Sequence, residues 1–264
     1  MLWLWITLGV VGGAALIILF IWFNNSCLKT TKYKIEVEGV PENLRIVHLS
    51  DLHGKSFSRG NASLIKKIVG AKPDFIAITG DIIHKYRQKD KDVAVALVAS
   101  LKEVAPVIYC SGNHEMRGIA YRFLRKDLSE AGATVLDDCS ADVCGYSVTG
   151  LNCASLKNDT IFKITPQSDI KILLAHEPHF FEKYAEAGYD LVMCGHAHGG
   201  QWRIPFTGRG VYAPGQGFMP KYTQGVHKKG KTHMVVSRGL GNSRFPLRLF
   251  NRPELVIIDI NVKN

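Results

Sequence analysis

Five short segments that carry Asp, Asn or His recur along this chain in a fixed order, and most directly follow a stretch typical of a buried strand. The segments are Asp51-Leu52-His53, Gly80-Asp81, Gly112-Asn113-His114-Glu115, His176 and Gly195-His196-Ala197-His198. The strands expected before them span residues 44–49, 75–79, 107–110, 170–175 and 191–194. Because the carboxyl ends of parallel strands meet at one edge of a sheet, we expect these side chains to converge on a single site.

The order of elements predicts an α/β fold with two β-α halves in one domain. In the first half, buried strands alternate with helices expected over residues 61–69, 92–104 and 121–131, which is typical of a layered sheet with parallel strands. The second half has short strands and one helix, and loops rich in Gly and Pro after residue 200. Its expected elements are strands at 134–136, 147–151, 170–175, 191–194, 232–237 and 255–260 and a helix at 178–187.

The amino-terminal residues 2–23 form an almost unbroken apolar run without charge, and as a helix they would extend about 33 Å, enough to cross a bilayer. A cleavable signal peptide and a buried core helix are the alternatives. No Lys or Arg precedes the run, and Asn24-Asn25-Ser26 is a poor cleavage site, so the pattern favours a retained anchor. The expected organisation is a transmembrane anchor at residues 1–24, a linker with a first edge strand at 25–43 and a globular domain at 44–264.

Positive charge beyond the apolar run predicts the orientation of the anchor. Lys29, Lys32 and Lys34 follow it closely, and positively charged flanks stay in the cytoplasm. We therefore expect a single-pass protein of the cell membrane whose globular domain is cytoplasmic. In that reducing compartment Cys139 and Cys144 would remain thiols, although the sequence alone leaves their pairing open.

The net charge of +10 is unevenly distributed along the chain. Residues 201–253 contain ten Lys or Arg and no Asp or Glu, whereas the rest of the chain is neutral. This basic block also carries aromatic residues and Met, for example Phe218 and Met219. A solvated surface is one interpretation, and docking on an anionic membrane surface is the other. We expect the membrane surface and no nucleic-acid partner, because the chain has no motif that reads nucleic acid.

The five segments taken together have a chemical interpretation that single residues would not support. Asp51 or Asp81 alone would be typical of a helix cap, and His176 alone of a buried core histidine. Together, two carboxylates, one amide and several imidazoles suit a pair of divalent transition-metal ions. Such a two-metal centre performs in-line displacement at phosphorus.

These segments, read as D-x-H, G-D, G-N-H-E, a later His and G-H-x-H, resemble the calcineurin-like metallophosphoesterase family over about residues 44–200. The sequences around His176-Glu177-Pro178 and after His198, together with the anchor, are similar to a membrane-attached bacterial branch that resembles the UDP-2,3-diacylglucosamine pyrophosphatases. The resemblance implies a four-layer α-β-β-α sandwich with metal ions above the strand ends.

The resemblance also implies a role for each residue of the site. The implied metal ligands are Asp51, His53 and His198 for the first ion, Asn113, His176 and His196 for the second, and Asp81 as the bridge between them. His114 would be a catalytic histidine near the leaving group, able to stabilise phosphoryl charge or donate a proton. Glu115 would support the loop or a ligating imidazole. Asn152 is a weak candidate for substrate contact. The remaining histidines are expected to be structural or peripheral: His48, His84, His179, His227 and His233.

The implied activity is hydrolysis of a phosphodiester or pyrophosphate bond by a hydroxide shared between two metal ions, with a lipid-linked or nucleotide-lipid substrate. Mn²⁺ is the first choice of metal, since mixed nitrogen and oxygen ligands suit it. Fe, Zn, Mg and Ni are alternatives, because such ligands do not select one ion. A broad-specificity phosphatase and a nucleotide phosphodiesterase remain alternatives. A non-catalytic protein-binding scaffold would be expected to have lost ligands, whereas every expected position is filled here.

Overall fold

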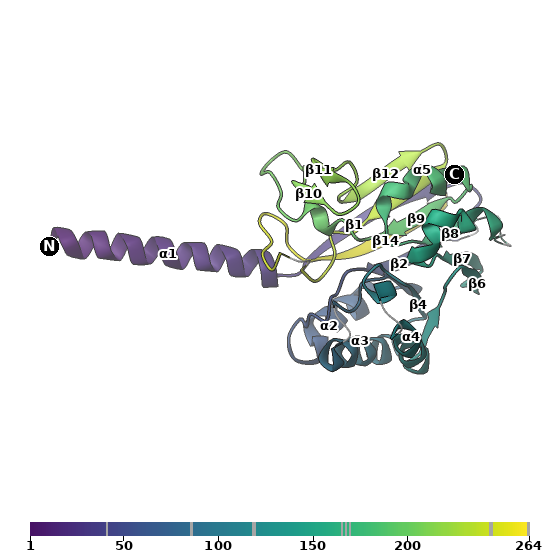
Figure 1. The fold of residues 1–264 in the computed structure, drawn as a ribbon, viewed down its shortest axis with the longest axis horizontal. Helices are drawn as coiled ribbons and strands as arrows, with labels where there is room; N and C mark the ends of the chain where they lie inside the picture. The colour runs from purple at the N-terminus through teal and green to yellow at the C-terminus, as the bar shows by residue number, and fades with distance from the viewer. Residues whose placement is uncertain are drawn as a thin grey trace.

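Two six-stranded sheets form the body of the domain in a computed structural model of the chain (Figure 1). The structure describes residues 1–262 except 41, 85–86, 118–119, 165, 167, 169 and 243–244. In the first sheet, β2 to β5 run parallel, β14 is antiparallel to β2, and β1 is parallel to β14. Its strands, in spatial order, are β1 (Lys29–Val37), β14 (Glu254–Val262), β2 (Leu44–Leu49), β3 (Phe75–Thr79), β4 (Val107–Cys110) and β5 (Ala133–Val135).

The second sheet has a parallel centre with an antiparallel strand at each edge. A separate two-stranded hairpin, β10 (Tyr212–Ala213) with β11 (Gly217–Phe218), lies outside both sheets. The strands of the second sheet, in spatial order, are β12 (Gly225–Lys229), β13 (Thr232–Val236), β9 (Leu191–Cys194), β8 (Lys171–Leu174), β7 (Tyr146–Gly150) and β6 (Cys139–Val143).

Helices cover the outer face of each sheet and produce four layers. In β3, Ile76 and Ile78 pack into the core beneath the helices of the first half, whereas Phe75 and Ala77 pack between the two sheets. β8 and β9 alternate in the same way between the inter-sheet core and the core beneath α5. The helices are α2 (Ala62–Ala71), α3 (Gln88–Leu101) and α4 (Tyr121–Glu130) on the first sheet and α5 (Phe181–Glu186) on the second. The four-layer α-β-β-α sandwich expected from the sequence is therefore confirmed.

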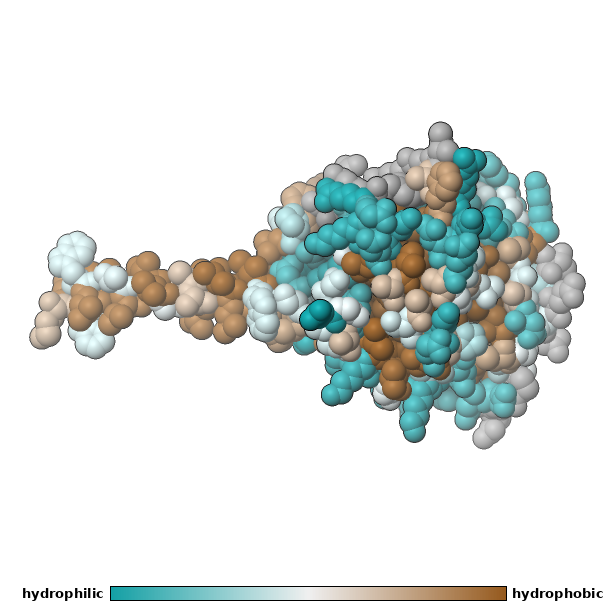
Figure 2. Space-filling view, turned by 90° about the horizontal axis from the view of Figure 1, so that it is seen from below, coloured by the Kyte–Doolittle hydropathy of each residue, from teal (hydrophilic) through white to brown (hydrophobic). Residues whose placement is uncertain are grey.

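The amino-terminal helix α1 (Leu2–Ser26) projects away from the domain. An 18-residue window in it has a mean hydropathy of 2.5 and is fully exposed, so the helix is long and apolar enough to cross a membrane. Figure 2 shows it as a largely brown rod beside a domain that carries many teal side chains. Among the described residues it is the one helix with these properties.

The strand directions place the foot of α1 beside the carboxyl ends of the central strands. Lys29, which follows α1 closely, pairs with Glu254 at the start of β14. β14 runs antiparallel to β2, with Val256 opposite His48. The edge of the first sheet where β2 ends is therefore the edge from which α1 emerges.

The structure differs from the sequence-based expectation mainly at the sheet edges. Residues 29–33, expected as polar linker, form the first half of β1, and the edge strands β6 and β12 were not expected. All three strands expose most of their side chains, so they lack the apolar signal of a buried strand. The helix expected over 178–187 is shorter, because a 3-10 turn at Pro178–Phe180 precedes α5. Cys139 and Cys144 are both exposed free thiols.

Candidate metal centre

The five polar segments meet at the edge formed by the carboxyl ends of β2, β3, β4, β8 and β9. Asp51 and His53 follow β2, and Asp81 follows β3. The segments after β4, β8 and β9 supply Asn113 with His114, then His176, then His196 with His198. The sequence identified these residues because each lies within a few positions of a strand end, and the parallel register brings those ends together.

The first cluster consists of Asp51, His53 and His198, whose ligand atoms all lie within 4.8 Å of one another. The Nε2 atoms of His53 and His198 are 3.2 Å apart. His198 Nε2 is also 3.3 Å from Asp51 Oδ1. All three side chains are buried, so two imidazoles and a carboxylate share one small space that could hold a cation.

The second cluster consists of Asp81, His176 and His196, again with ligand atoms within 4.8 Å. His176 Nε2 lies 3.3 Å from Asp81 Oδ2 and 3.2 Å from His196 Nδ1. Asp81 Oδ2 is also 3.8 Å from His53 Nε2 in the first cluster. Asp81 therefore lies between the two clusters, where one carboxylate could contact two ions.

Asn113 provides an independent test of whether the site fits metal ions. Its Oδ1 atom is buried and has no hydrogen-bond partner among the described residues. An unpaired buried oxygen costs free energy, about 1–3 kcal/mol for a neutral group, unless a ligand satisfies it. Asn113 lines the same cavity as Asp81 and His196. The mixed imidazole, carboxylate and amide set therefore fits divalent transition-metal ions.

The backbone of the site is held in an uncommon conformation. Five of its residues have φ between 47° and 65°, the left-handed region that costs free energy for a residue with a Cβ atom. They are Asp51, His53, Asp81, His196 and His198. Two glycines allow the close approach of these loops: a Cβ atom at Gly112 would overlap Asp81 Oδ1, and one at Gly195 would overlap Ser50 Oγ.

Hydrogen bonds orient the ligand-type side chains from behind. His176 Nδ1 donates to Thr79 O over 2.7 Å, which directs Nε2 towards Asp81. The Glu115 carboxylate accepts from the backbone N–H groups of Asp81 and Gly112, each over 2.7 Å, and from Ile83 over 3.2 Å. Glu115 therefore joins the loop after β3 to the loop after β4. Of the two roles expected for Glu115 from the sequence, these hydrogen bonds show the first, which is support of the loop.

The electrostatic surroundings favour an ionised Asp81 and neutral imidazoles at His53 and His196. Burial alone would raise the pKa of Asp81, but the surrounding imidazoles, His176 above all, hold it well below its usual range. Burial opposes charge on His176 as well, yet Asp81 and Asp51 raise its pKa to about 10. Burial lowers the pKa of His53 and His196 to about 3.

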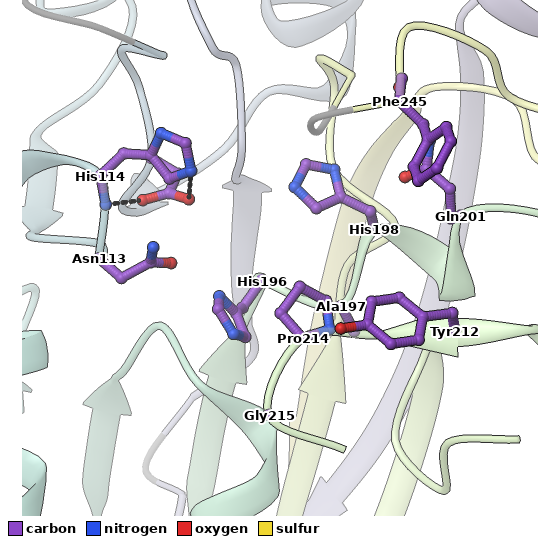
Figure 3. A pocket seen from close by; sticks show the side chains of 11 residues that line it. Asn113, His114, His196, Ala197, His198, Gln201, Tyr212, Pro214, Gly215 and Phe245 are labelled. Carbon is purple, nitrogen blue, oxygen red and sulfur yellow. Dashed lines mark hydrogen bonds and ion pairs between the residues drawn. The ribbon is translucent and has the colours of Figure 1, made fainter. Parts of the chain in front are cut away.

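A cavity of about 430 Å³ opens beside the two clusters. Figure 3 shows Asn113 and His114 on one side of it, Tyr212, Gln201 and Phe245 on the other, and His196 and His198 between them. His114 Nδ1 donates to His84 O over 2.8 Å, and its Nε2 lies 3.9 Å from Asp81 Oδ2. The His114 ring therefore presents Nε2 to the cavity and is not part of the two ligand clusters described above.

Some residues near the cavity were not expected from the sequence. His84, expected to be peripheral, has a ligand-type atom within 4.8 Å of those of His53 and His114. Gln201 and Phe245 reach the cavity from loops and Tyr212 from the two-residue strand β10, and none of these segments has a periodic pattern. The aromatic content of the basic block was the one signal that could have indicated Tyr212 and Phe245.

Other candidates have local structural roles. His48 Nε2 lies 2.8 Å from Thr79 Oγ1 in the core, and the Asn152 side chain accepts from Ala154 N over 2.9 Å as a turn cap. His227, on β12, has its Nε2 atom 3.0 Å from Gln224 O. These contacts give His48, Asn152 and His227 partners within the fold.

Comparison with known proteins agrees with this geometry. A family model described as calcineurin-like phosphoesterase matches residues 44–200. The chain is 29% identical over 251 residues to the uncharacterised metallophosphoesterase YkuE of Bacillus subtilis, covering 90% of this chain and 87% of the relative. It is 29% identical over 230 residues to the phosphodiesterase YaeI of Escherichia coli, covering 82% of each. It is 28% identical over 266 residues to an uncharacterised metallophosphoesterase of Aquifex aeolicus, covering 89% and 93%.

The match to the family model covers more than half of the chain and contains all the polar segments that converge at the sheet edge. The fold has the mixed sheets and flanking helices of that family, and the site has the His and Asp groups that its divalent metal chemistry requires. The chain therefore belongs to the calcineurin-like phosphoesterase family and is a metal-dependent phosphoesterase.

Proposed function

We propose that the protein is a membrane-attached, dinuclear-metal phosphohydrolase that cleaves a phosphodiester or pyrophosphate bond in a lipid-linked or nucleotide-lipid substrate. The observation that carries the proposal is the pair of ligand clusters on either side of Asp81, next to a cavity of about 430 Å³. The E. coli relative is named a phosphodiesterase, which supports a diester bond. The similarity to the UDP-2,3-diacylglucosamine pyrophosphatases is part of the same proposal.

Each cluster would hold one ion. The proposed ligands are Asp51, His53 and His198 for the first ion, Asn113, His176 and His196 for the second, and Asp81 for both. The distances within each cluster and the unpaired Oδ1 of Asn113 support this assignment. Mn²⁺ is our first choice, since imidazole nitrogen and carboxylate or amide oxygen together suit it, and metal analysis of the purified protein tests that choice.

When bound, such an ion pair would lower the pKa of a water molecule and neutralise charge on the phosphoryl group. The protein's own side chains supply the remaining chemistry. His114, anchored through Nδ1 to His84 O, presents Nε2 to the cavity and would donate a proton to the departing oxygen. Gln201 and Tyr212 on the opposite wall would limit how the substrate enters.

The proposed place of action is the cytoplasmic face of the cell membrane. α1 supports attachment, since it is apolar and exposed along its spanning window. Lys29, Lys32 and Lys34 are exposed on β1 directly after the helix, which supports a cytoplasmic domain. The basic block can offer fewer positive charges to an anionic membrane surface than its sequence indicates, because some of its arginines, such as Arg203 and Arg248, are buried.

Substitution of Asp81 tests the proposal directly. We expect Asp81→Ala to lower hydrolysis of bis-p-nitrophenyl phosphate with added Mn²⁺ by at least about a thousandfold, because both ions lose a ligand. Asp92→Ala, at an exposed position on α3, is the matched control and should retain activity. Circular dichroism would show that both variants are folded. A folded Asp81→Ala protein with wild-type turnover would overturn the assignment.

A substrate comparison separates the proposal from its alternatives within the same chemistry. Turnover on UDP-diacylglucosamine, cyclic nucleotides and phosphate monoesters would be measured with Mn²⁺ under identical conditions. Preference for the lipid-linked pyrophosphate supports the proposal. Equal turnover on all three would indicate a broad-specificity phosphatase, and preference for cyclic nucleotides a nucleotide phosphodiesterase.

A further inference from the structure

A second, apolar groove adjoins the metal-site cavity. It has a volume of about 260 Å³ and a lining that is mostly aromatic. It shares three walls with the metal-site cavity, namely Gln201, Tyr212 and Phe245. The remaining groove residues, which do not line that cavity, are Trp202, Val211 and Phe218. A molecule whose phosphate lies near Asp81 could therefore extend directly into an apolar environment.

Hydrogen bonds fix the wall between the two spaces. Gln201 Nε2 donates to Phe245 O over 2.9 Å and to Leu247 O over 3.2 Å. Trp202 Nε1 donates to Leu247 O over 3.1 Å. The rings of Trp202 and Phe245 meet edge to face with centroids 5.8 Å apart. The groove is thus formed by side chains that are held in place and not by a loose loop.

The groove continues towards the membrane helix. Trp202 pairs with Leu249, and the next residue, Phe250, contacts Phe20 of α1 with ring centroids 5.0 Å apart. Arg248 N donates to Asn25 Oδ1 over 2.8 Å, which ties the same loop to the end of the helix. Figure 1 shows β10, β11 and the yellow loop before β14 on the side of the domain from which α1 extends. The groove therefore opens on the side of the domain that a membrane around α1 would face.

Exposed apolar side chains surround this part of the surface. Phe206 is fully exposed and Phe218 is 80% exposed, and Met219, Phe245 and Phe250 are exposed as well. Leaving such large apolar side chains in water is unfavourable, and a cluster of them marks a surface that meets another apolar phase. The bilayer that α1 would span is the apolar phase closest to them.

We infer that this groove binds a hydrocarbon chain of the substrate, while the phosphate of the same molecule lies at the metal centre. The inference rests on the proposed function, because it takes the substrate to be a membrane lipid. The shared walls, the aromatic lining and the contact of the loop with α1 select a lipid from the membrane that holds the helix. A nucleotide base could stack on the same rings, but it would gain nothing from the exposed Phe and Met residues towards α1.

A chain-length series tests the inference with the full-length protein in nanodiscs loaded with Mn²⁺. The probes are p-nitrophenyl phosphodiesters whose second ester group is methyl, butyl or octyl. We expect kcat/KM to rise by at least about tenfold from methyl to octyl, since each buried methylene contributes at most about fourfold. In Trp202→Ser/Phe218→Ser the rise should fall to less than about threefold. The matched control is Phe123→Ser, which removes a half-exposed ring on α4 and should retain the full rise.

The outcomes separate this inference from the proposed function. No hydrolysis of the methyl diester by the wild-type protein would contradict the proposed function itself. Hydrolysis of all three diesters at equal kcat/KM would leave the phosphoesterase intact and overturn the groove inference. A rise of kcat/KM with chain length that persists in Trp202→Ser/Phe218→Ser would also overturn the groove inference. The same holds if a thymidine p-nitrophenyl diester is preferred over the octyl diester and this preference is lost in the double variant.

Discussion

At the scale of single residues, the site combines strained backbone with closely fitted glycines. The five residues with left-handed φ, from Asp51 to His198, each turn the chain sharply just after a strand, which aims the side chain back over the sheet edge. Such conformations persist only where the surroundings hold them, as the Glu115 carboxylate does for the loops of Asp81 and Gly112. The positions of the ligand atoms therefore depend on residues outside the two ligand clusters, such as Glu115 and Gly112.

Gly112→Ala tests this dependence. The added Cβ atom would overlap both Oδ1 and the backbone N of Asp81, so it must displace the proposed bridging carboxylate. We expect Mn²⁺ affinity to fall by about 10–100-fold, as is typical when a group that supports a ligand is altered, with the fold retained. Isothermal titration calorimetry measures the affinity. Gly70→Ala in α2, where the Cβ atom meets nothing within 4 Å, is the control and should bind Mn²⁺ normally. Unchanged affinity in Gly112→Ala would contradict the argument.

The sequence indicated the polar residues of the site and not their partners. Asp51, Asp81 and His176 were identifiable because an ionisable residue at the end of a buried strand is conspicuous. His84 and Tyr212 were not, because their proximity to the site follows from how loops pack in three dimensions. Neither local spacing nor periodicity records such a contact, so the ligand-type residues could be predicted from the sequence and the cavity walls could not.

At the scale of elements, a buried ion pair joins the strand beside the anchor to the second sheet. Glu254, the first residue of β14, accepts from Arg238 Nη2 over 2.9 Å and from Arg238 N over 3.0 Å. It also accepts from Thr31 Oγ1 of β1 over 2.5 Å. Arg238 follows β13 of the second sheet, so one carboxylate connects both sheets at the edge that carries the metal centre.

Glu254→Gln tests the energetic importance of this connection. Burial opposes the charge of Glu254, but Arg238 and Thr31 lower its pKa below the usual value. The ionised carboxylate therefore stabilises the fold above the pKa that the residue has when unfolded, about 4.3, and this contribution is lost as the pH falls through the folded pKa. We expect the variant to lose about 3 kcal/mol of unfolding free energy at pH 7, because Arg238 would remain buried without its partner.

Urea unfolding in detergent, followed by circular dichroism at pH 7, 5 and 3.5, measures the effect. The difference between wild type and Glu254→Gln should be largest at pH 7 and narrow towards pH 3.5. Asp159→Asn removes a solvent-exposed ion pair with Lys183 and should cost less than about 1 kcal/mol. A difference that does not depend on pH would show that the carboxylate charge is not what stabilises this edge.

The elements themselves were predictable where they are buried. β3, β4 and β9 have the expected bounds, because every residue in them is apolar or buried and strands of that kind read as continuous hydrophobic runs. The edge strands β1, β6 and β12 are polar on their exposed faces and gave no such signal. Pairing of β1 with β14 joins residues more than 200 positions apart, which no local pattern encodes.

At the scale of the whole molecule, the sheet directions relate the chemistry to the anchor. β1 begins where α1 ends, and it pairs in parallel with β14. Because β14 is antiparallel to β2, the end of β2 lies at the same edge of the sheet as the start of β1. Asn251 continues this link, because its N–H donates to Asn24 Oδ1 over 3.2 Å while its Nδ2 donates to His198 O over 2.7 Å. The end of α1 is therefore two hydrogen bonds away from a proposed metal ligand.

In the proposed attachment through α1, the side of the membrane on which the domain lies decides which lipids can reach the metal centre. Three exposed lysines, Lys29, Lys32 and Lys34, follow α1 and favour the cytoplasmic side, where anionic lipids attract them by about 1 kcal/mol each. Cys139 and Cys144 are exposed free thiols on the domain and can report its location. We expect a membrane-impermeant maleimide to label them in inverted membrane vesicles and not in intact cells.

Two controls make the labelling specific to these positions. Cys139→Ser/Cys144→Ser should abolish most of the labelling in inverted vesicles, because Cys110, Cys153 and Cys194 are buried and Cys27 is only partly exposed. A cysteine introduced at Leu2, at the other end of α1, should show the opposite pattern and react in intact cells. Strong labelling of Cys139 and Cys144 in intact cells would place the metal centre against the outer leaflet. The lipid that reaches the groove would then come from that leaflet, and the lysine argument would be wrong.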